Sequence, residues 1–196
     1  MSPRPTPVTG VNDVIRLPAT AAAASAALRN GVVIDVETTG LDAAADCVIE
    51  VAALRVREAK VVATFTTLIR PETPIPAVIT ELTGITAGMA SAAPPMETVA
   101  AELVRHLCDG NPVIVGHNVD FDLSFLSRSH DGFPPPKAQA LCTAECARAL
   151  IPRHEVGRYR LDRVAAALGM QQRPRHRALD DAWTTFEVLA KLSARA

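Results

Sequence analysis

"GVVIDVETTGLD", residues 31–42 of this 196-residue chain, is the stretch from which the class of fold is most readily predicted. Its apolar residues are β-branched and almost continuous: Val32, Val33, Ile34 and Val36. A short run of this kind, followed by a Thr-Thr-Gly turn, is typical of a strand that is buried in the middle of a sheet. Two acids, Asp35 and Glu37, interrupt the run.

Asp35 and Glu37 are two positions apart, so in a strand their side chains point to the same face. Carboxylates held together in an apolar strand repel each other, and they need a basic partner, a raised pKa or a cation. The nearest basic residues in the sequence are Arg29 and Arg55. Because oxygen ligands suit Mg²⁺ or Mn²⁺, we interpret the pair as metal ligands. The alternative is a strand end that carries two solvated acids.

The rest of the chain predicts an α/β domain. Two further strands are expected over 46–58 and 60–71, which with the first would form an antiparallel meander. Helical periodicity and buried runs then alternate. One strand is expected over 112–117, and residues 139–152, "QALCTAECARALIP", are expected to be a short strand running into a helix. The order β-β-β-α-β-α-β-α-α-α predicts a mixed five-stranded sheet, with its first three strands antiparallel, flanked by helices. Residues 1–28 are predicted to be an N-terminal extension, disordered over about the first ten residues and then helical. Residues 29–196 are predicted to form the domain.

Further candidate site residues follow in two clusters. In "VGHNVDFDLSFL" a strand ends and Asp122 lies in the first turn of the next helix, near the strand ends where ligands gather in α/β sheets. In "RPRHRALDDAW", His176 precedes Asp181 by five residues at the start of the last helix. A histidine can accept a proton near neutral pH. Four carboxylates and one histidine suit a hydrolytic site that holds two metal ions.

The motifs together resemble the DEDDh branch of the DnaQ-like 3′–5′ exonucleases, a family with a ribonuclease H-like fold. The first motif, D-x-E-T-T-G-L, begins at Asp35, and "VIEVAAL" and "ELTGIT" match a strand and a loop of the family. The second motif, H-N-x-x-F-D-x-x-F-L, begins at His117. The third, H-x-A-x-x-D, begins at His176. The resemblance covers roughly residues 30 to 194, so residues 29–196 would be the exonuclease domain.

This resemblance implies a chemistry and a set of residues. Two divalent cations, Mg²⁺ or Mn²⁺, would be held by four acids: Asp35, Glu37, Asp122 and Asp181. His176 would deprotonate the attacking water, and Glu37 would be catalytic as well as a ligand. The product would be a nucleoside 5′-monophosphate released from a 3′ end. The terminal nucleotide would contact seven residues: Thr38, Thr39, Gly40, Leu41, His117, Asn118 and Phe121. One departure is visible, because many family members have Asp-Thr where this chain has Cys142-Thr143.

Composition narrows the partners. The formal net charge is −1 and the longest apolar runs are short, so a membrane partner is not expected and a cytoplasmic protein is predicted. Residues 153–177 contain seven arginines against Glu155 and Asp162, and such a basic rim favours phosphates. The resemblance implies that the phosphates belong to the 3′ end of a nucleic acid, with DNA favoured and RNA possible.

Three functions remain open at this point. The first is an exonuclease acting on DNA, free-standing or associated with a DNA polymerase in proofreading; the T-T-G-L form of the first motif favours it by resemblance. The second is an RNA-directed relative, such as an oligoribonuclease-like enzyme. The third is a non-catalytic, polymerase-accessory module that binds nucleic acid. The retained acids and histidine argue against the third.

Overall fold

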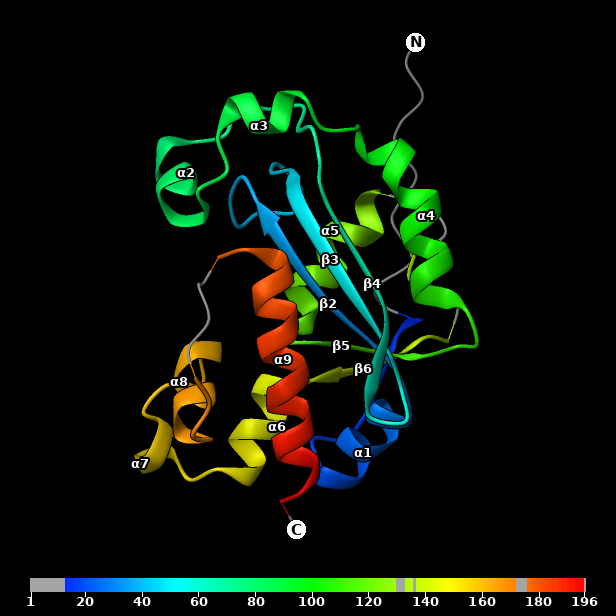
Figure 1. Ribbon diagram of the computed structural model, residues 1–196, viewed down its shortest axis with the longest axis vertical. Coiled ribbons are helices and arrows are strands. Elements are labelled where there is room, and N and C mark those ends of the chain that lie inside the picture. Colours follow the sequence, from blue (N-terminus) through cyan, green and yellow to red (C-terminus); the bar gives the residue numbers. More distant parts are fainter. Residues whose placement is uncertain (1–12, 130–132, 136, 172–175, 196) are drawn as a thin grey trace.

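The computed structural model describes residues 13–129, 133–135, 137–171 and 176–195 (Figure 1). The predicted disorder of the first ten residues lies outside these ranges. The strands are β1 (Ile15–Arg16), β2 (Asn30–Thr38), β3 (Val48–Arg57), β4 (Lys60–Leu68), β5 (Val113–Gly116) and β6 (Gln139–Cys142). The helices are α1 (Ala21–Arg29), α2 (Ala77–Thr83), α3 (Ala87–Ser91), α4 (Met96–Cys108), α5 (Val119–Ser129), α6 (Thr143–Leu150), α7 (Arg153–Val156), α8 (Leu161–Ala167) and α9 (Ala178–Ser193).

The described strands form one mixed sheet in the order β1-β6-β5-β2-β3-β4. β2, β3 and β4 pair antiparallel, as predicted, and β5 pairs parallel with both β2 and β6. The predicted α/β class and mixed sheet are confirmed. A sixth strand was not predicted: β1 pairs parallel with β6, with Ile15 N–H donating to Ala138 O at 2.8 Å. A strand of two residues is too short to show periodicity in the sequence.

Helices cover both faces of the sheet (Figure 1). One core cluster joins α1, α6, α8 and α9 to the face that carries Val33 and Leu54. The other joins α4 and α5 to the face that carries Val32 and Ile34. β2 is therefore buried from both sides, which explains its continuous apolar run. Helix α1 of the N-terminal extension packs in the first cluster through Ala24 and Ala27; the domain boundary at residue 28 stays a prediction.

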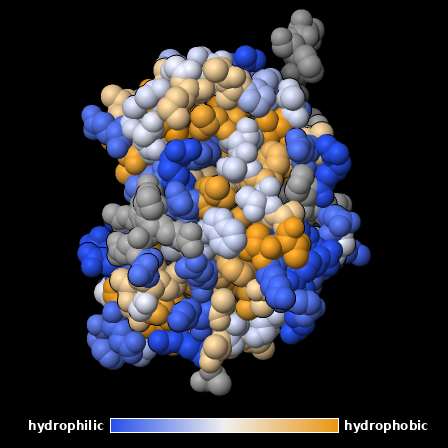
Figure 2. All heavy atoms as spheres, in the orientation of Figure 1, coloured by the Kyte–Doolittle hydropathy of each residue, from blue (hydrophilic) through white to orange (hydrophobic). Residues whose placement is uncertain are grey.

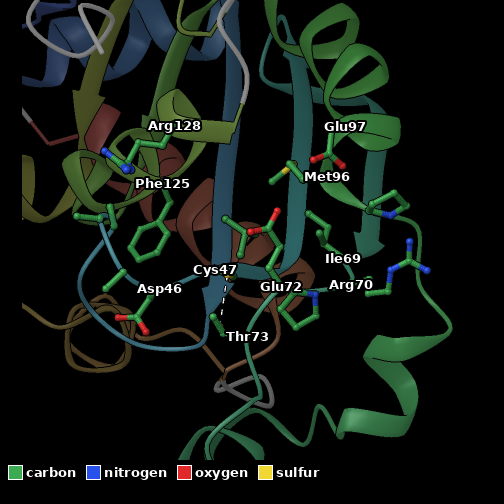
Figure 3. A pocket seen from close by; sticks show the side chains of 16 residues that line it. Asp46, Cys47, Ile69, Arg70, Glu72, Thr73, Met96, Glu97, Phe125 and Arg128 are labelled. Carbon is green, nitrogen blue, oxygen red and sulfur yellow. Dashed lines mark hydrogen bonds between the residues drawn. The ribbon is translucent and has the colours of Figure 1, made fainter. Parts of the chain in front are cut away.

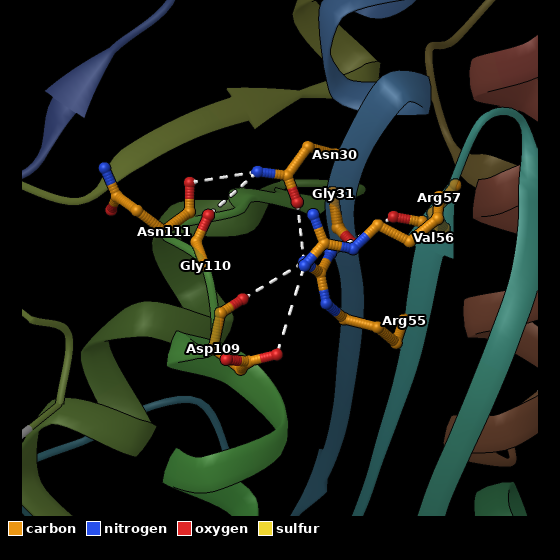
Figure 4. Close-up of polar contacts among 8 residues, drawn as sticks. All are labelled: Asn30, Gly31, Arg55, Val56, Arg57, Asp109, Gly110 and Asn111. Atoms are coloured by element: carbon orange, nitrogen blue, oxygen red, sulfur yellow. Dashed lines mark hydrogen bonds and ion pairs between the residues drawn. The ribbon is translucent and has the colours of Figure 1, made fainter.

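The buried Arg55 makes several hydrogen bonds at the end of the sheet where β2 begins (Figure 4). The Arg55 guanidinium donates to Gly31 O at 2.5 Å, to Asn30 Oδ1 at 2.6 Å and to Asp109 O at 3.1 Å. Burial lowers the pKa of Arg55, with a smaller contribution from the charge of Arg57. The buried cation thus joins β2, β3 and the loop after α4 through hydrogen bonds.

We expect Arg55→Met to destabilise the protein, because the acceptors at Asn30, Gly31 and Asp109 lose their donor. The free energy of unfolding should fall by about 2–3 kcal/mol and the melting temperature by roughly 5–10 °C, measured by circular dichroism. Arg57→Met is the matched control, since that guanidinium is half exposed and lies 4.0 Å from the Asp109 carboxylate. An equal loss of stability in the two variants would contradict the stabilising role given to the Arg55 hydrogen bonds.

Within the described ranges, no helix combines the length and the apolar character needed to cross a bilayer.

Candidate active site

The end of β2 places Asp35 and Glu37 on the face of the sheet that α9 covers. Both side chains have the same parity as Val33, which packs in the α9 cluster. In the register with β3, Asp35 lies opposite Ala52 and Glu37 lies opposite Glu50. The register shifts between Glu37 and Thr38, so the regular ladder ends directly after the second acid.

Asp122 reaches the same strand from α5. Its Oδ1 accepts a hydrogen bond of 3.1 Å from the backbone N–H of Val36, which lies between the two acids of β2. Gly116, at the end of β5, makes room for this approach: a Cβ there would lie 3.1 Å from the Asp122 carboxylate. Asp122 is therefore buried against β2, while Asp120 in the same helical turn points outward to an ion pair with Arg16.

The N-terminal end of α9 brings Asp181 and His176 to Glu37. One ligand atom from each of these three side chains lies within 4.8 Å of the other two. His176 has a backbone φ of 61°, in the left-handed region, and its N–H donates to Asp181 Oδ2 at 3.1 Å. Figure 1 shows this end of α9 beside the end of β2. Among the described residues, this cluster of ligand atoms holds three of the five predicted residues. Asp122 and Asp35 lie next to it without belonging to it: Asp122 bonds the N–H of Val36, and the charges of Asp122, Asp181 and Glu37 act on Asp35.

The carboxyl groups of the site have raised pKa values. Burial, followed by the charge of Asp181 and then that of Glu50, raises the pKa of Glu37 from 4.5 to about 8. Burial also raises the pKa of Asp122 to about 8, and it raises the pKa of Asp35 well above its ordinary value, with Asp122 as the next cause. Carboxyl oxygens in this arrangement fit a divalent cation, whose charge would let all of them ionise.

The residues predicted to contact the substrate differ in exposure and in how many of their polar groups are already hydrogen-bonded within the protein. Thr38 Oγ1 donates to Gly40 O at 2.5 Å, and Thr39 Oγ1 both accepts from Cys47 N–H and contacts Asp46. Gly40 packs against the Asp46 carboxylate, where a Cβ would approach to 2.3 Å. The loop after β2 is therefore held by its own side chains. It presents Leu41, which is 88% exposed.

His117 is engaged inside the protein. Its Nε2 lies 3.0 Å from Tyr159 O, which can only accept, and its Nδ1 lies 2.9 Å from Thr143 Oγ1. Burial lowers the pKa of His117 to about 4, so the ring is neutral. Thr143 belongs to the Cys142-Thr143 pair noted above, and Cys142 is buried. Asn118 beside it is exposed, and Phe121 packs against Phe125 with ring centroids 4.9 Å apart.

A cleft of about 370 Å³ opens beside this cluster, and His117, Asn118, Tyr159, His176 and Asp181 are among its lining residues. Figure 2 shows hydrophilic atoms gathered between the α2–α3 region and α9, next to apolar atoms. A larger pocket of about 550 Å³ lies on the other side of the loop after β2, lined by Cys47, Phe125 and Arg128 (Figure 3). None of the four acids lines this larger pocket, whereas Asp181 and His176 line the smaller cleft.

Two residues near the site were not predicted as functional. Glu50 is 3% exposed and pairs with Arg177, whose Nη2 lies 2.7 Å from Glu50 Oε1. An acid inside the otherwise apolar strand "VIEVAAL" is the same signal that marked β2, and it could have revealed Glu50. Arg177 had been counted in the basic rim. Of the other rim residues, Arg160 and Arg163 pair with Asp162, and Arg173 and Arg175 lie outside the described residues.

Comparison with known proteins decides the family. A family model described as exonuclease, RNase T, matches residues 32–189 and so includes every candidate site residue. The chain belongs to this exonuclease family. The resemblance to DnaQ-like exonucleases is thereby confirmed, and with it the assignment of the protein as an enzyme that hydrolyses phosphodiester bonds.

The relatives of this exonuclease include a DNA polymerase III subunit and PolC-type DNA polymerase III proteins. The DNA polymerase III subunit epsilon of Aquifex aeolicus is 36% identical over 163 residues, covering 82% of this chain and 79% of the relative. A PolC-type DNA polymerase III of Clostridium perfringens is 36% identical over 159 residues, 81% of this chain, and this chain spans only 11% of its length. The structure of exonuclease X with 5′ overhanging duplex DNA matches with a TM-score of 0.65 and 28% identity, covering 82% of this chain and 89% of that one.

Proposed function

We propose that this protein is a metal-dependent 3′–5′ exonuclease that removes nucleoside 5′-monophosphates from the 3′ ends of DNA, with single-stranded ends preferred. The observation that carries the proposal is the convergence of the four acids with His176 at the end of β2. The names of the two polymerase relatives, and the DNA bound by exonuclease X, support DNA over RNA. They also make a DNA polymerase the partner that this function predicts.

In the proposed mechanism Asp35, Glu37, Asp122 and Asp181 hold two Mg²⁺ or Mn²⁺ ions. The ions would supply an activated water and stabilise the charge that develops on the phosphate. His176 stands beside Glu37 and Asp181 at the open end of α9 and takes the proton of the attacking water through its imidazole. Leu41 and Asn118 are exposed around the site and position the terminal nucleotide. Thr38, Thr39 and Gly40 form the loop after β2 that the nucleotide contacts.

The test is nucleotide release from labelled ends. Single-stranded DNA, duplex DNA with a recessed 3′ end and single-stranded RNA are incubated with the protein and Mg²⁺, Mn²⁺ or EDTA. We expect 5′-mononucleotides from 3′-labelled DNA with either metal and none with EDTA. Faster nucleotide release from RNA than from DNA would show that RNA, and not DNA, is the preferred substrate. The absence of release from every substrate would leave the accessory, non-catalytic function.

Metal binding should depend steeply on pH. The pKa values of about 8 for Glu37 and Asp122 mean that the metal-free fold holds protons which the unfolded chain, with carboxyl pKa values near 4, has lost. Between about pH 4 and 8 the stability of the metal-free protein therefore falls as the pH rises. Metal binding must displace these protons, so affinity rises over the same range.

We expect Mn²⁺ to raise the melting temperature by a few degrees at about pH 8 and to leave it nearly unchanged at about pH 5.5. Differential scanning fluorimetry at several pH values, with EDTA as the reference, measures this. An equal effect of Mn²⁺ at both pH values would show that these carboxyls do not bind the ion.

A further inference from the structure

Glu50 and Arg177 form an ion pair beside the site, with Glu50 buried and Arg177 partly exposed. The Glu50 carboxylate is 3% exposed, and it lies on the same face of the sheet as Asp35 and Glu37. Both of its oxygens accept from Arg177 Nε, at 3.2 and 3.1 Å, and Oε1 also accepts from Nη2 at 2.7 Å. This fork-to-carboxylate geometry is the most directional ion pair that side chains make.

The same carboxylate also holds the first turn of α9. Its Oε2 accepts from the backbone N–H of Ala178 at 2.9 Å, which is one of the donors that a helix start leaves without an internal partner. Arg177 is the N-cap residue of α9 and makes no side-chain capping bond of its own. Glu50, which is 127 residues away in the sequence, takes the place of that cap and ties the start of α9 to β3.

The tie lies between the two residues that α9 brings to the site. His176 directly precedes Arg177, and Asp181 lies one turn after it, with the Asp181 carboxylate accepting from His176 N–H. A shift of Arg177 and Ala178 therefore moves both His176 and Asp181 relative to Glu37 on the fixed strand β2. Since metal and general-base geometry tolerate little displacement, the position of this helix start matters for catalysis.

We propose that Glu50 and Arg177 are positioning residues, which lock the start of α9 so that His176 and Asp181 meet Glu37 at the distances that the reaction needs. This inference rests on the proposed function. The ion pair also limits the negative charge near the carboxylates of the site. Glu50 lies opposite Glu37 in the strand register, and without the Arg177 guanidinium the negative charge of Glu50 would be unpaired there. Arg177 neutralises Glu50, so the carboxylate can hold the helix.

Three variants test this: Glu50→Gln, Arg177→Met and the double variant. Arg177→Met leaves the Glu50 charge buried without its partner and should lower kcat by about 10- to 100-fold with KM changed less than threefold. Glu50→Gln keeps an acceptor for Ala178 N–H and should lower kcat by about tenfold. The double variant removes both charges, so it should recover part of the activity lost in Arg177→Met, which is a non-additive result that independent roles would not give.

Two further measurements do not depend on activity. Hydrogen exchange of the first turn of α9, followed by mass spectrometry on the metal-free protein, should accelerate about tenfold or more in Arg177→Met. The affinity for Mn²⁺, measured by calorimetry, should weaken by about tenfold. Arg57→Met, an arginine on the same strand β3 but paired with the carboxylate of Asp109, is the matched control and should leave all three quantities unchanged.

A different pattern would overturn the proposal. The Arg177 side chain is 43% exposed, so it can also reach a phosphate of the substrate. If Arg177→Met raises KM while kcat and the exchange of α9 stay at wild-type values, Arg177 binds substrate and does not position the helix. If the wild-type protein releases no nucleotide, the proposed function fails, while the exchange and Mn²⁺ measurements still decide whether the pair holds the helix start.

Discussion

Replacing Asp35 with asparagine is expected to abolish nucleotide release and, at the same time, to stabilise the metal-free protein. Asp35 is the acid whose pKa burial and the neighbouring Asp122 carboxylate raise well above its ordinary value. In the proposed mechanism Asp35 is a metal ligand in its charged form, and a neutral amide of the same shape binds a hard cation poorly. The loss of activity should be about 1,000-fold or more in kcat, which corresponds to about 4 kcal/mol of transition-state stabilisation.

The gain in stability has the same origin. In the metal-free fold the Asp35 carboxyl either carries a proton or repels its neighbours, and an amide avoids both. At about pH 8, Asp35→Asn should raise the melting temperature without metal by roughly 5 °C, and Mn²⁺ should add little. Activity on 3′-labelled DNA and scanning fluorimetry with EDTA or Mn²⁺ measure the two effects.

Asp120→Asn is the control for this experiment. Asp120 is an exposed acid in the first turn of α5, two residues before Asp122, and it pairs with Arg16 at the surface. Because surface pairs of this kind contribute about 0–1 kcal/mol, the variant should keep wild-type activity and stability. Wild-type activity in Asp35→Asn, or an equal loss of activity in Asp120→Asn, would contradict the assignment of Asp35 to the active site.

The second large effect is expected from His176→Gln. If His176 takes the proton of the attacking water, its removal should lower kcat by about 100- to 10,000-fold. The affinity for Mn²⁺ should stay within about threefold of wild type, because the four carboxylates supply the ligands.

The structure makes this a sharp test, because it places a ring nitrogen of His176 within 4.8 Å of ligand oxygens of Glu37 and Asp181. From there the ring can either take a proton or bind the ion. A loss of Mn²⁺ affinity of 100-fold or so, seen by calorimetry, would make His176 a metal ligand and would leave the general base to be found elsewhere. Retained affinity with lost turnover would support the base.

Much of the fold could be predicted from short-range patterns. The apolar run of β2, the alternation of β4 and the periodicity of α4 and α9 each reflect a local geometry that repeats within a few residues. β1 and the separation of α2 from α3 were not predicted. Both are short, and β1 exists because its backbone pairs with β6, which no neighbouring residue specifies.

The order of residues was enough to select Asp35 and Glu37 as candidate ligands. They share a face because strand geometry requires it, and no basic residue is near them in the sequence. Which groups surround them depends on the tertiary structure, which brings the charge of Arg177 close enough to act on Glu37. In the folded protein both ring nitrogens of His117 have hydrogen-bond partners, and Leu41 is exposed. Glu50 contacts the start of α9 through Arg177, which is 127 residues away in the sequence. Contacts at that separation depend on how the layers pack, and no local periodicity records them.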